Sequence, residues 1–406
     1  MSENSSGTAD VLSMDLSKYL KNRGERSSVS YTAYIPLELL EGSYLGKVYG
    51  YFVEDTGIFN ITGTTPVAFN ANVVDIGYIF DSPFETTHGL AGVRENGKLS
   101  FTYHGQPVTC IPYSLTREVY SRNTGILESD IMLHKRAVVV GCGSGGSFIA
   151  LELAKAGVGK FVLIDNDIIE YHNIGRHVCS VYDVGKWKVD AVRERILSIN
   201  PSSEVVIFRN LIEEIPESEL SQYLDDNTLI MNCGDTRSSA HRSNAYSEKY
   251  NVPFIAAGAG VRASTGEVYY YLPKQGMPCY SCVVGEDMTI DTSNRVRRIA
   301  YADEIQEFQP GLSADINYIG IIAVKLAIDI LMRNEEGYCL RLLPYLTQFT
   351  MIGNYVAATD AEKDPQHPNY NPLLQLFDTP LEIIHGVVEK REGCYFCKMI
   401  EERKFE

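Results

Sequence analysis

The stretch "VVVGCGSGGSFIALELAKAGVGKFVLIDND", Val138 to Asp167, decides the fold of this chain. A short run of β-branched residues leads into closely spaced glycines, then into an apolar segment, then into a second apolar run with an acidic end. The pattern predicts a buried strand over 136–140, a helix over 147–157 and a second strand over 160–165. A strand, a glycine turn, a helix and a strand in this order are typical of a nucleotide-binding βαβ unit.

The alternation of strands and helices continues beyond this stretch. Residues 186–201 predict a helix, because apolar side chains recur there at helical spacing: Val189, Val192, Ile196 and Ile199. Three further apolar runs, 204–208, 228–232 and 253–258, are expected as strands, and residues 315–332 as a buried helix. Short connections between such elements favour a parallel sheet covered on both faces. We therefore predict an α/β, Rossmann-like, doubly wound domain with a mainly parallel sheet.

The amino-terminal part of the chain has a different character. Residues 1–28 are rich in Ser, Asn and Gly, which predicts a flexible leader. Residues 29–114 contain short aromatic and β-branched runs broken by Gly, Pro and Asn, which predicts a small β-rich accessory domain. The α/β domain then occupies residues 115–406.

Composition excludes several classes of protein. The net charge of −16 argues against a nucleic-acid-binding surface, because neutralising phosphates needs clustered Lys and Arg. No apolar run approaches the ~18 residues that span a bilayer, and no signal peptide is evident, so we expect a cytoplasmic protein without a membrane partner. Nine cysteines in a long chain without a secretion signal argue against a disulfide framework and favour metal ligation by those that come in pairs.

The glycine turn predicts a phosphate-binding loop. Glycines let the backbone turn tightly and approach a phosphate, while the helix amino terminus supplies N–H donors; the glycines are Gly141, Gly143, Gly145 and Gly146. Asp165, at the end of the following strand, can accept hydrogen bonds from a ribose hydroxyl. These features fit NAD as well as ATP, so an NAD-dependent oxidoreductase is one hypothesis.

Two cations downstream favour a triphosphate. Arg176 offers a bidentate fork to phosphate oxygens, and Lys188, at the start of the next helix, offers a compact positive charge. A hydride-transfer enzyme leaves both without a role.

In this order the motifs resemble the ubiquitin-activating enzyme superfamily of ThiF-like adenylyltransferases, which includes the bacterial enzymes of molybdopterin and thiamine synthesis. The resemblance extends from Arg122 to Cys397. Its motifs are "YSRN" (120–123), "GCGSGG" (141–146), "DND" (165–167), "NIGR" (173–176), "GKWK" (185–188) and "NCGDTR" (232–237). Two positions depart from the family: His177 stands where a Gln is usual, and Asn232 where many members have an Asp.

The resemblance implies a role for each matched residue. Asp165 would hold the ribose, with Asp167 in the same nucleotide site, and Asp235 would hold Mg²⁺. The triphosphate would be contacted by Asn173, Arg176 and Lys188. Arg122 resembles the arginine that reaches into the partner subunit's site in dimeric members, which implies a homodimer.

The implied chemistry is adenylation of a carboxylate. A terminal carboxyl group of pKa about 3.5 is ionised at pH 7, so its attack on the α-phosphate needs no general base. The obstacle is the repulsion between two anions, which cations and Mg²⁺ overcome. Arg122, Arg176, Lys188 and Asp235 are therefore the expected catalytic residues.

Two Cys-x-x-Cys pairs predict a structural zinc site. Cys279 and Cys282 form the first pair, and Cys394 and Cys397 form the second. Four thiolates can complete a tetrahedral zinc site that fastens the carboxy-terminal segment to the core. The resemblance supports the long separation of the pairs, because many members carry such a split site.

The remaining cysteines leave thioester formation open. Superfamily members that make a thioester often carry the cysteine after the first zinc pair, but residues 283–338 contain none. Cys110 and Cys339 are the candidates outside the nucleotide motifs. Cysteines within those motifs are expected to be structural or to line the nucleotide pocket: Cys142, Cys179 and Cys233.

We therefore predict a homodimeric enzyme that uses ATP and Mg²⁺ to activate the carboxy-terminal carboxylate of a ubiquitin-like protein for transfer to a conjugating enzyme. The β-rich domain would help to bind one of these partners. The main alternative is a sulfur-carrier activator, whose adenylate becomes a thiocarboxylate. Three further hypotheses stay open: an adenylating enzyme for a small peptide or a tRNA base, the NAD-dependent oxidoreductase and a non-catalytic scaffold.

Overall fold

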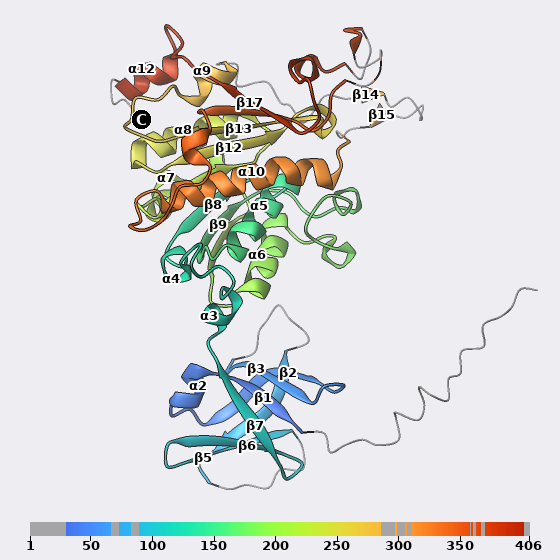
Figure 1. The fold of residues 1–406 in the computed structure, drawn as a ribbon, viewed down its shortest axis with the longest axis vertical. Helices are drawn as coiled ribbons and strands as arrows, with labels where there is room; N and C mark the ends of the chain where they lie inside the picture. Colours follow the sequence, from blue (N-terminus) through green and yellow to red (C-terminus); the bar gives the residue numbers. More distant parts are fainter. Residues whose placement is uncertain are drawn as a thin grey trace, which may run out of the picture. The chain divides into compact units, whose positions relative to one another are not determined.

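The computed structural model describes residues 30–65, 73–82, 89–285, 297–298, 305–306, 310–357, 359, 363–366 and 370–401. The chain divides into two compact units, the first ending at Leu115 and the second beginning at Thr116 (Figure 1). The predicted leader, residues 1–28, lies outside the described residues.

The described part of the first unit is a closed β-barrel. Its strands follow the order β1-β3-β2-β4-β5-β6-β7, and β1 pairs with β7 to close the ring. The strands are β1 Thr32–Pro36, β2 Gly46–Val53, β3 Ile58–Gly63, β4 Val74–Phe80, β5 Leu90–Glu95, β6 Lys98–Tyr103 and β7 Gln106–Tyr113, with the short helix α2 Leu37–Glu41. Inward residues such as Leu99 and Phe101 alternate with exposed ones, which is the pattern of a sheet with one buried face.

Two tight turns set the register of the last three strands. Asn96 and Gly97 join β5 to β6, and His104 and Gly105 join β6 to β7, with positive φ at all four residues. Two-residue turns of this kind match the twist of the strands they connect. The predicted β-rich domain is therefore confirmed, as a closed barrel.

The second unit contains an eight-stranded sheet of order β10-β9-β8-β11-β12-β13-β16-β17. The strands are β8 Arg136–Val140, β9 Lys160–Ile164, β10 Glu204–Phe208, β11 Thr228–Asn232, β12 Phe254–Ala259, β13 Thr265–Tyr271, β16 Phe349–Gly353 and β17 Glu382–Gly386. The strands from β10 to β12 pair in parallel, which confirms the doubly wound prediction. The strands from β12 to β17 pair antiparallel, an extension that the sequence pattern did not predict. A separate two-stranded pair joins β14 Arg297–Arg298 to β15 Ile305–Gln306.

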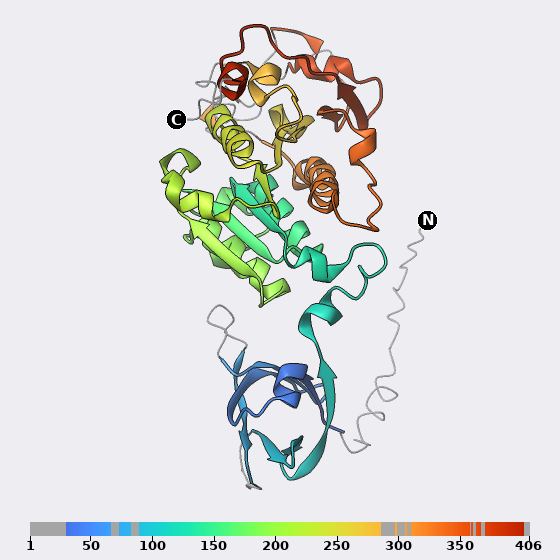
Figure 2. The same ribbon diagram turned by 90° about the vertical axis from the view of Figure 1, so that its left-hand side faces the viewer.

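Helices cover both faces of this sheet (Figure 2). One core cluster joins the helices α5, α6 and α10 to the sheet, and a second joins α8 to the opposite face. Among the described residues, the long helices are α5 Ser144–Lys155, α6 Lys188–Ile199, α8 Arg237–Tyr250 and α10 Ser313–Met332. The shorter helices are α3 Leu115–Val119, α4 Ser129–Met132, α7 Glu217–Leu220, α9 Tyr280–Val284 and α12 Tyr395–Glu401.

Helix α10 is the most apolar of the long helices, and it lies beside α5. An added Cβ on Gly320 would lie 2.8 Å from Phe148, so glycine permits this close packing. Among the described residues, no helix is long and apolar enough to cross a lipid bilayer.

Candidate functional site

The glycine loop connects β8 to α5 and contains two kinds of glycine. Gly141 has φ +85°, and a Cβ on it would lie 2.8 Å from the amide nitrogen of Gly234. A Cβ on Gly146 would lie 1.8 Å from the carbonyl oxygen of Gly141. A Cβ on Gly143 would meet no atom of the described residues within 4 Å, and one on Gly145 would make only an ordinary contact. Close packing thus requires glycine at positions 141 and 146, whereas Gly143 borders open space.

The amino terminus of α5 faces this open space. Gly143 is the residue before the helix, and no side chain among the described residues caps the first turn there. The N–H groups of an uncapped first turn, together with the helix dipole, form a site for an anion such as a phosphate. The space at Gly143 therefore fits the phosphate group that the sequence predicted.

Asp165 holds the loop in this shape. One carboxylate oxygen accepts the N–H of Cys142 at 2.7 Å, and the other accepts the N–H of Asp167 at 2.8 Å. Burial raises the pKa of Asp165, opposed by the charge of Lys188 and by these two hydrogen bonds. Each oxygen keeps a second lone pair that can accept a ribose hydroxyl.

The carboxylates predicted for the site lie around Lys188. It is the first residue of α6, only 12% of its side chain is exposed, and its Nζ donates to Asp167 at 2.8 Å. Burial lowers its pKa, but the charges of Asp165, Asp167 and Asp235 outweigh burial and raise it overall. The structure thus brings Asp165, Asp167, Lys188 and Asp235 into one electrostatic group at the carboxyl edge of the parallel strands.

Asn173 and Arg176 lie on the turn between β9 and α6. The side-chain oxygen of Asn173 accepts the N–H of Glu170 at 2.9 Å, and its carbonyl oxygen accepts the N–H of Arg176 at 3.0 Å. The guanidinium of Arg176 reaches Gly311, where an added Cβ would lie 3.8 Å from its Nη1. Arg176 therefore lies next to the start of α10, whose residue Ile316 also approaches Gly145 of the loop.

A second short network is formed by residues on either side of Asp235 in the sequence. The amide of Asn232, at the end of β11, donates to the hydroxyls of Ser239 and Ser243 at 3.1 and 3.2 Å. Thr236 caps α8 by accepting the N–H of Ser239 at 3.3 Å. Both hydroxyls already donate to backbone carbonyls, Ser239 to Thr236 at 2.9 Å and Ser243 to Ser239 at 2.8 Å. The side chain at position 232 must therefore donate to them, which an amide can do and an aspartate cannot. Thr236 was missed in the sequence, although a threonine before a helix is a typical cap.

Arg122 does not lie at the glycine loop of its own chain. The hydroxyl of Tyr120 donates to the carbonyl of Ala154 at 2.9 Å, and the amide of Asn123 donates to the carbonyl of Lys155 at 3.2 Å. Both acceptors lie at the carboxyl end of α5, whereas the glycine loop lies at its amino end. A helix of this length spans about 18 Å.

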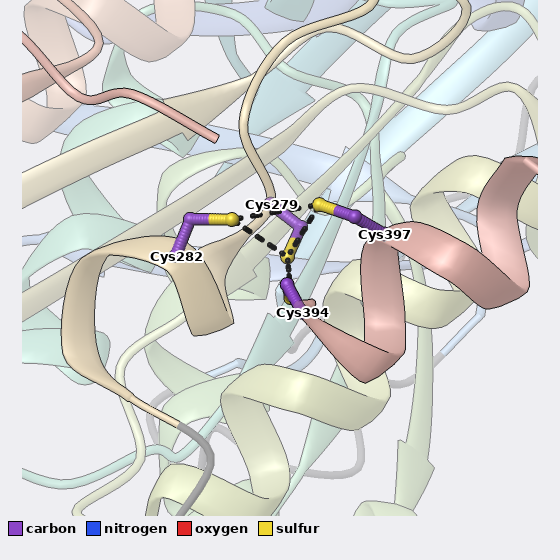
Figure 3. A group of neighbouring side chains, drawn as sticks. All are labelled: Cys279, Cys282, Cys394 and Cys397. Carbon is purple, nitrogen blue, oxygen red and sulfur yellow. Dashed lines mark hydrogen bonds between the residues drawn. The ribbon is translucent and has the colours of Figure 1, made fainter. Parts of the chain in front are cut away.

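The four paired cysteines form one cluster (Figure 3). A tetrahedral site with Zn–S bonds of about 2.3 Å requires S–S distances of about 3.8 Å. The Sγ of Cys279 lies 3.7 Å from that of Cys282 and 3.6 Å from that of Cys394, and the Sγ atoms of Cys282 and Cys397 are 3.5 Å apart. All four sulfurs lie within 4.8 Å of one another, and all four residues are buried. The donor set and its size fit Zn²⁺.

The cluster joins two distant parts of the second unit. Cys279 and Cys282 belong to the start of α9, and Cys394 and Cys397 to the start of α12 (Figure 3). The N–H of Arg391 donates to the Sγ of Cys282 at 3.3 Å, a contact that favours a thiolate. A metal held here would fasten α12 to α9.

The other cysteines lack the environment of a nucleophile or lie away from the loop. Burial raises the pKa of Cys142 strongly, that of Cys179 to about 11 and that of Cys233 to about 12. Burial also raises the pKa of Cys110, in strand β7 of the barrel. A thiol with a raised pKa is a poor nucleophile at neutral pH.

Cys339 is exposed, but it lies beyond the far end of α10. Asp329 anchors its loop by accepting the N–H groups of Arg341 and Leu342 and the hydroxyl of Tyr338, at 2.6 to 2.9 Å. The residue of α10 that approaches the glycine loop, Ile316, precedes Asp329 by more than three turns, about 20 Å along the helix. The structure does not bring Cys339 to the glycine loop.

Comparison with known proteins gives consistent matches. The sequence profile of the ThiF family matches residues 117–369. The molybdopterin-synthase adenylyltransferase of Escherichia coli (strain K12) is 27% identical over 168 residues, which are 41% of this chain and 66% of that protein. The ubiquitin-like modifier-activating enzyme 5 of Caenorhabditis elegans is 27% identical over 183 residues, 42% of each chain. The matched segment thus spans less than two thirds of either relative.

Among solved structures, E. coli MccB with ATP is 22% identical to this chain, with a TM-score of 0.48. The match covers 71% of this chain and 76% of that chain.

Proposed function

This chain belongs to the ThiF family, and from that premise we propose that its second unit uses ATP to adenylate a carboxylate. The observation that carries the proposal is the grouping of Asp165, Asp167 and Asp235 around Lys188, next to the open space at Gly143. A dehydrogenase needs no buried cation at this point, whereas a triphosphate needs several.

Each residue of the site would have its own task. The uncapped turn of α5 would bind a phosphate, and Asp165 would accept the ribose hydroxyls with its remaining lone pairs. Lys188 would exchange its contact with Asp167 for a phosphate oxygen, because both are anions within its reach. Arg176 and Asn173, on the adjoining turn, would contact the same triphosphate. Mg²⁺ bound by Asp235 would add positive charge next to the phosphate oxygens.

The substrate that we propose is the carboxy-terminal carboxylate of a ubiquitin-like protein, which then passes to a conjugating enzyme. The relative from C. elegans is named a modifier-activating enzyme, which supports this choice. The barrel would help to bind one of the two protein partners, since it forms a compact unit of its own.

The proposal has a direct test. The full chain, incubated with a ubiquitin-like protein and labelled pyrophosphate, is expected to form labelled ATP. Exchange should vanish when the last residue of that protein's tail is removed, and exchange that persists would contradict a role for the tail. A second experiment tests the role of the barrel. If a chain without residues 1–114 keeps full pyrophosphate exchange, adenylate transfer and partner binding, the barrel does not have the proposed role.

A sulfur-carrier activator is the second candidate, and the relative named molybdopterin-synthase adenylyltransferase favours it. The two candidates share the adenylation step and differ in the fate of the adenylate. Mass spectrometry of the incubated partner separates them, because a thiocarboxylate and a conjugate differ in mass.

We also propose a homodimer in which Arg122 serves the partner's site. The support is the position of Arg122 at the end of α5 opposite its own glycine loop. A two-fold axis places the same patch of each subunit against the other, so both sites would be completed at once.

Finally, we propose that the four-cysteine cluster holds a structural Zn²⁺. The metal would be bound by Cys279, Cys282, Cys394 and Cys397 and would contribute to folding rather than to the reaction. Metal analysis of the purified chain is expected to give one zinc per chain.

A further inference from the structure

His177 lies between the glycine loop and the turn that carries Arg176. Its Nε2 is 2.8 Å from the carbonyl oxygen of Cys142, and its Nδ1 is 3.2 Å from the backbone nitrogen of Cys179. The residue is buried, with 8% of its surface exposed. The imidazole thus bridges two segments that are far apart in the sequence.

The two contacts fix the proton of this ring. A carbonyl oxygen only accepts, so Nε2 must carry a hydrogen to bond with Cys142. A backbone N–H only donates, so Nδ1 must be without a hydrogen to bond with Cys179. Both ring nitrogens are therefore satisfied in one state alone, the neutral imidazole with its proton on Nε2.

This bridge completes the restraint on the loop. Cys142 donates its N–H to Asp165 at 2.7 Å and offers its carbonyl oxygen to His177. Both sides of Cys142 are held, one by the strand that carries Asp165 and the other by the turn that carries Arg176. The distance between the phosphate-binding loop and Arg176 thus depends on His177.

The surroundings favour the neutral ring. Burial is the largest influence and lowers the pKa of His177, and the charges of Lys188 and Arg195, both on α6, lower it further. The hydrogen bond with Cys142 and the charge of Asp183, six residues later in the chain, act in the opposite direction without cancelling the effect. The neutral form is therefore complete above the ordinary histidine pKa of about 6.5, and it is lost as pH falls through the lowered pKa of His177.

We propose that His177 is a positioning residue of the nucleotide site, and that the site weakens in acid when His177 takes up a second proton. The proton, taken from solvent, would occupy Nδ1 and face the N–H of Cys179, so that two donors oppose each other. The ring must then move and release the carbonyl of Cys142. A glutamine, which the resemblance leads one to expect here, offers the same donor and acceptor but does not titrate. The inference rests on the proposed nucleotide site.

The test compares three forms of the full chain by calorimetric titration with ATP·Mg²⁺ between about pH 7.5 and pH 5.5. His177→Ala is expected to weaken binding at every pH, by roughly fivefold. His177→Gln should recover most of that loss and should lose less affinity than the natural chain as pH falls. Protonation of ATP itself affects all three forms alike. Parallel pH profiles of the natural chain and His177→Gln would overturn the proposal.

A second readout does not depend on nucleotide. Nitrogen NMR of the natural chain, with His177→Gln to assign the signal, should show a neutral ring protonated on Nε2 at pH 7.5. A charged ring or a proton on Nδ1 would overturn the inference. Failure of the proposed function has a different signature, because the natural chain would then not bind ATP·Mg²⁺ at pH 7.5 while the NMR signal stayed as expected.

Discussion

The proposed nucleotide site and the cysteine cluster are built in opposite ways. The site at the carboxyl edge of the parallel strands groups charged residues around Lys188, next to open space at Gly143. The cluster at α9 and α12 groups four buried thiols that face one another within 4.8 Å. The charged residues around Lys188 can replace their mutual contacts with contacts to a ligand, whereas the four enclosed thiols have room only for a metal ion. Substitutions in the two regions should therefore affect different properties of the protein.

The largest effect is expected at the nucleotide site. Lys188→Ala should lower the adenylation rate by about 10²–10³-fold, because it removes a preorganised positive charge from the phosphates. The free energy of unfolding should also fall, by roughly 1.5–3 kcal/mol, because the loss of this buried cation leaves Asp165, Asp167 and Asp235 without their shared counter-charge. Labelled pyrophosphate exchange and urea unfolding measure the two quantities.

Lys186→Ala is the matched control. Lys186 lies two residues earlier and bonds to Asp183 and Glu194 at 3.1 and 2.7 Å, away from the carboxylates of the site. Its replacement should leave the rate within about twofold, as expected of a partly exposed ion pair. Equal losses for both lysines would remove the distinction between the site and its surroundings.

The next effect is expected at the cysteine cluster, on stability instead of rate. Cys394→Ser should lower the free energy of unfolding by on the order of 3 kcal/mol or more, because the metal that fastens α12 to α9 is lost. Thermal unfolding with and without a chelator measures this. Cys339→Ser, at an exposed cysteine, serves as the control and should unfold like the natural chain. If Cys394→Ser unfolds like the natural chain, and if the chelator does not change the unfolding of the natural chain, the cluster is not a metal site.

Two glycines, Gly143 before α5 and Gly146 in its first turn, allow a finer comparison. Gly146→Ala should destabilise the chain by roughly 3 kcal/mol, because its Cβ would lie 1.8 Å from the carbonyl oxygen of Gly141. Gly143→Ala should leave stability within about 0.5 kcal/mol, because its Cβ meets nothing within 4 Å among the described residues, yet should weaken ATP binding. Unfolding and calorimetric titration check the pair. Full ATP affinity in Gly143→Ala would show that the phosphates bind elsewhere.

The smallest expected signal is a rescue. Mixed dimers of Arg122→Ala and Lys188→Ala contain one complete site, so a mixture that exchanges subunits should recover about a quarter of the natural rate. A mixture of Lys188→Ala and Asp235→Ala should recover none, because both residues serve the same site of the same chain. Absence of rescue in the first mixture, with dimers present, would place Arg122 at its own site.

The positions of most residues of the proposed nucleotide site were predictable because their motifs are local. The glycine loop, Asp165 and Lys188 lie at the ends of short, strongly patterned strands and helices, so sequence order alone placed them at one edge of the sheet. His177 could not be assigned a role in this way, because its partner Cys142 lies 35 residues earlier. Its signals were its position beside Arg176 and its departure from the glutamine that is usual in the family.

The antiparallel half of the sheet was missed for a related reason. The run of three tyrosines in β13 has no clear period of two, and β17 pairs with β16 across a long connection. Each of these two segments is a strand because it pairs with a strand that is distant in the sequence. The cysteine cluster shows the converse case, because the chemistry of the Cys-x-x-Cys pairs predicted a contact between residues more than 110 positions apart.

The central claim is that the charges around Lys188 form a site for ATP, and one titration tests it most directly. The full chain is titrated with ATP·Mg²⁺ and, separately, with NAD, and Lys188→Ala is titrated in the same way. We predict that the natural chain binds ATP·Mg²⁺ and not NAD, and that the variant loses at least about tenfold in ATP affinity. Binding of NAD without binding of ATP would contradict the account.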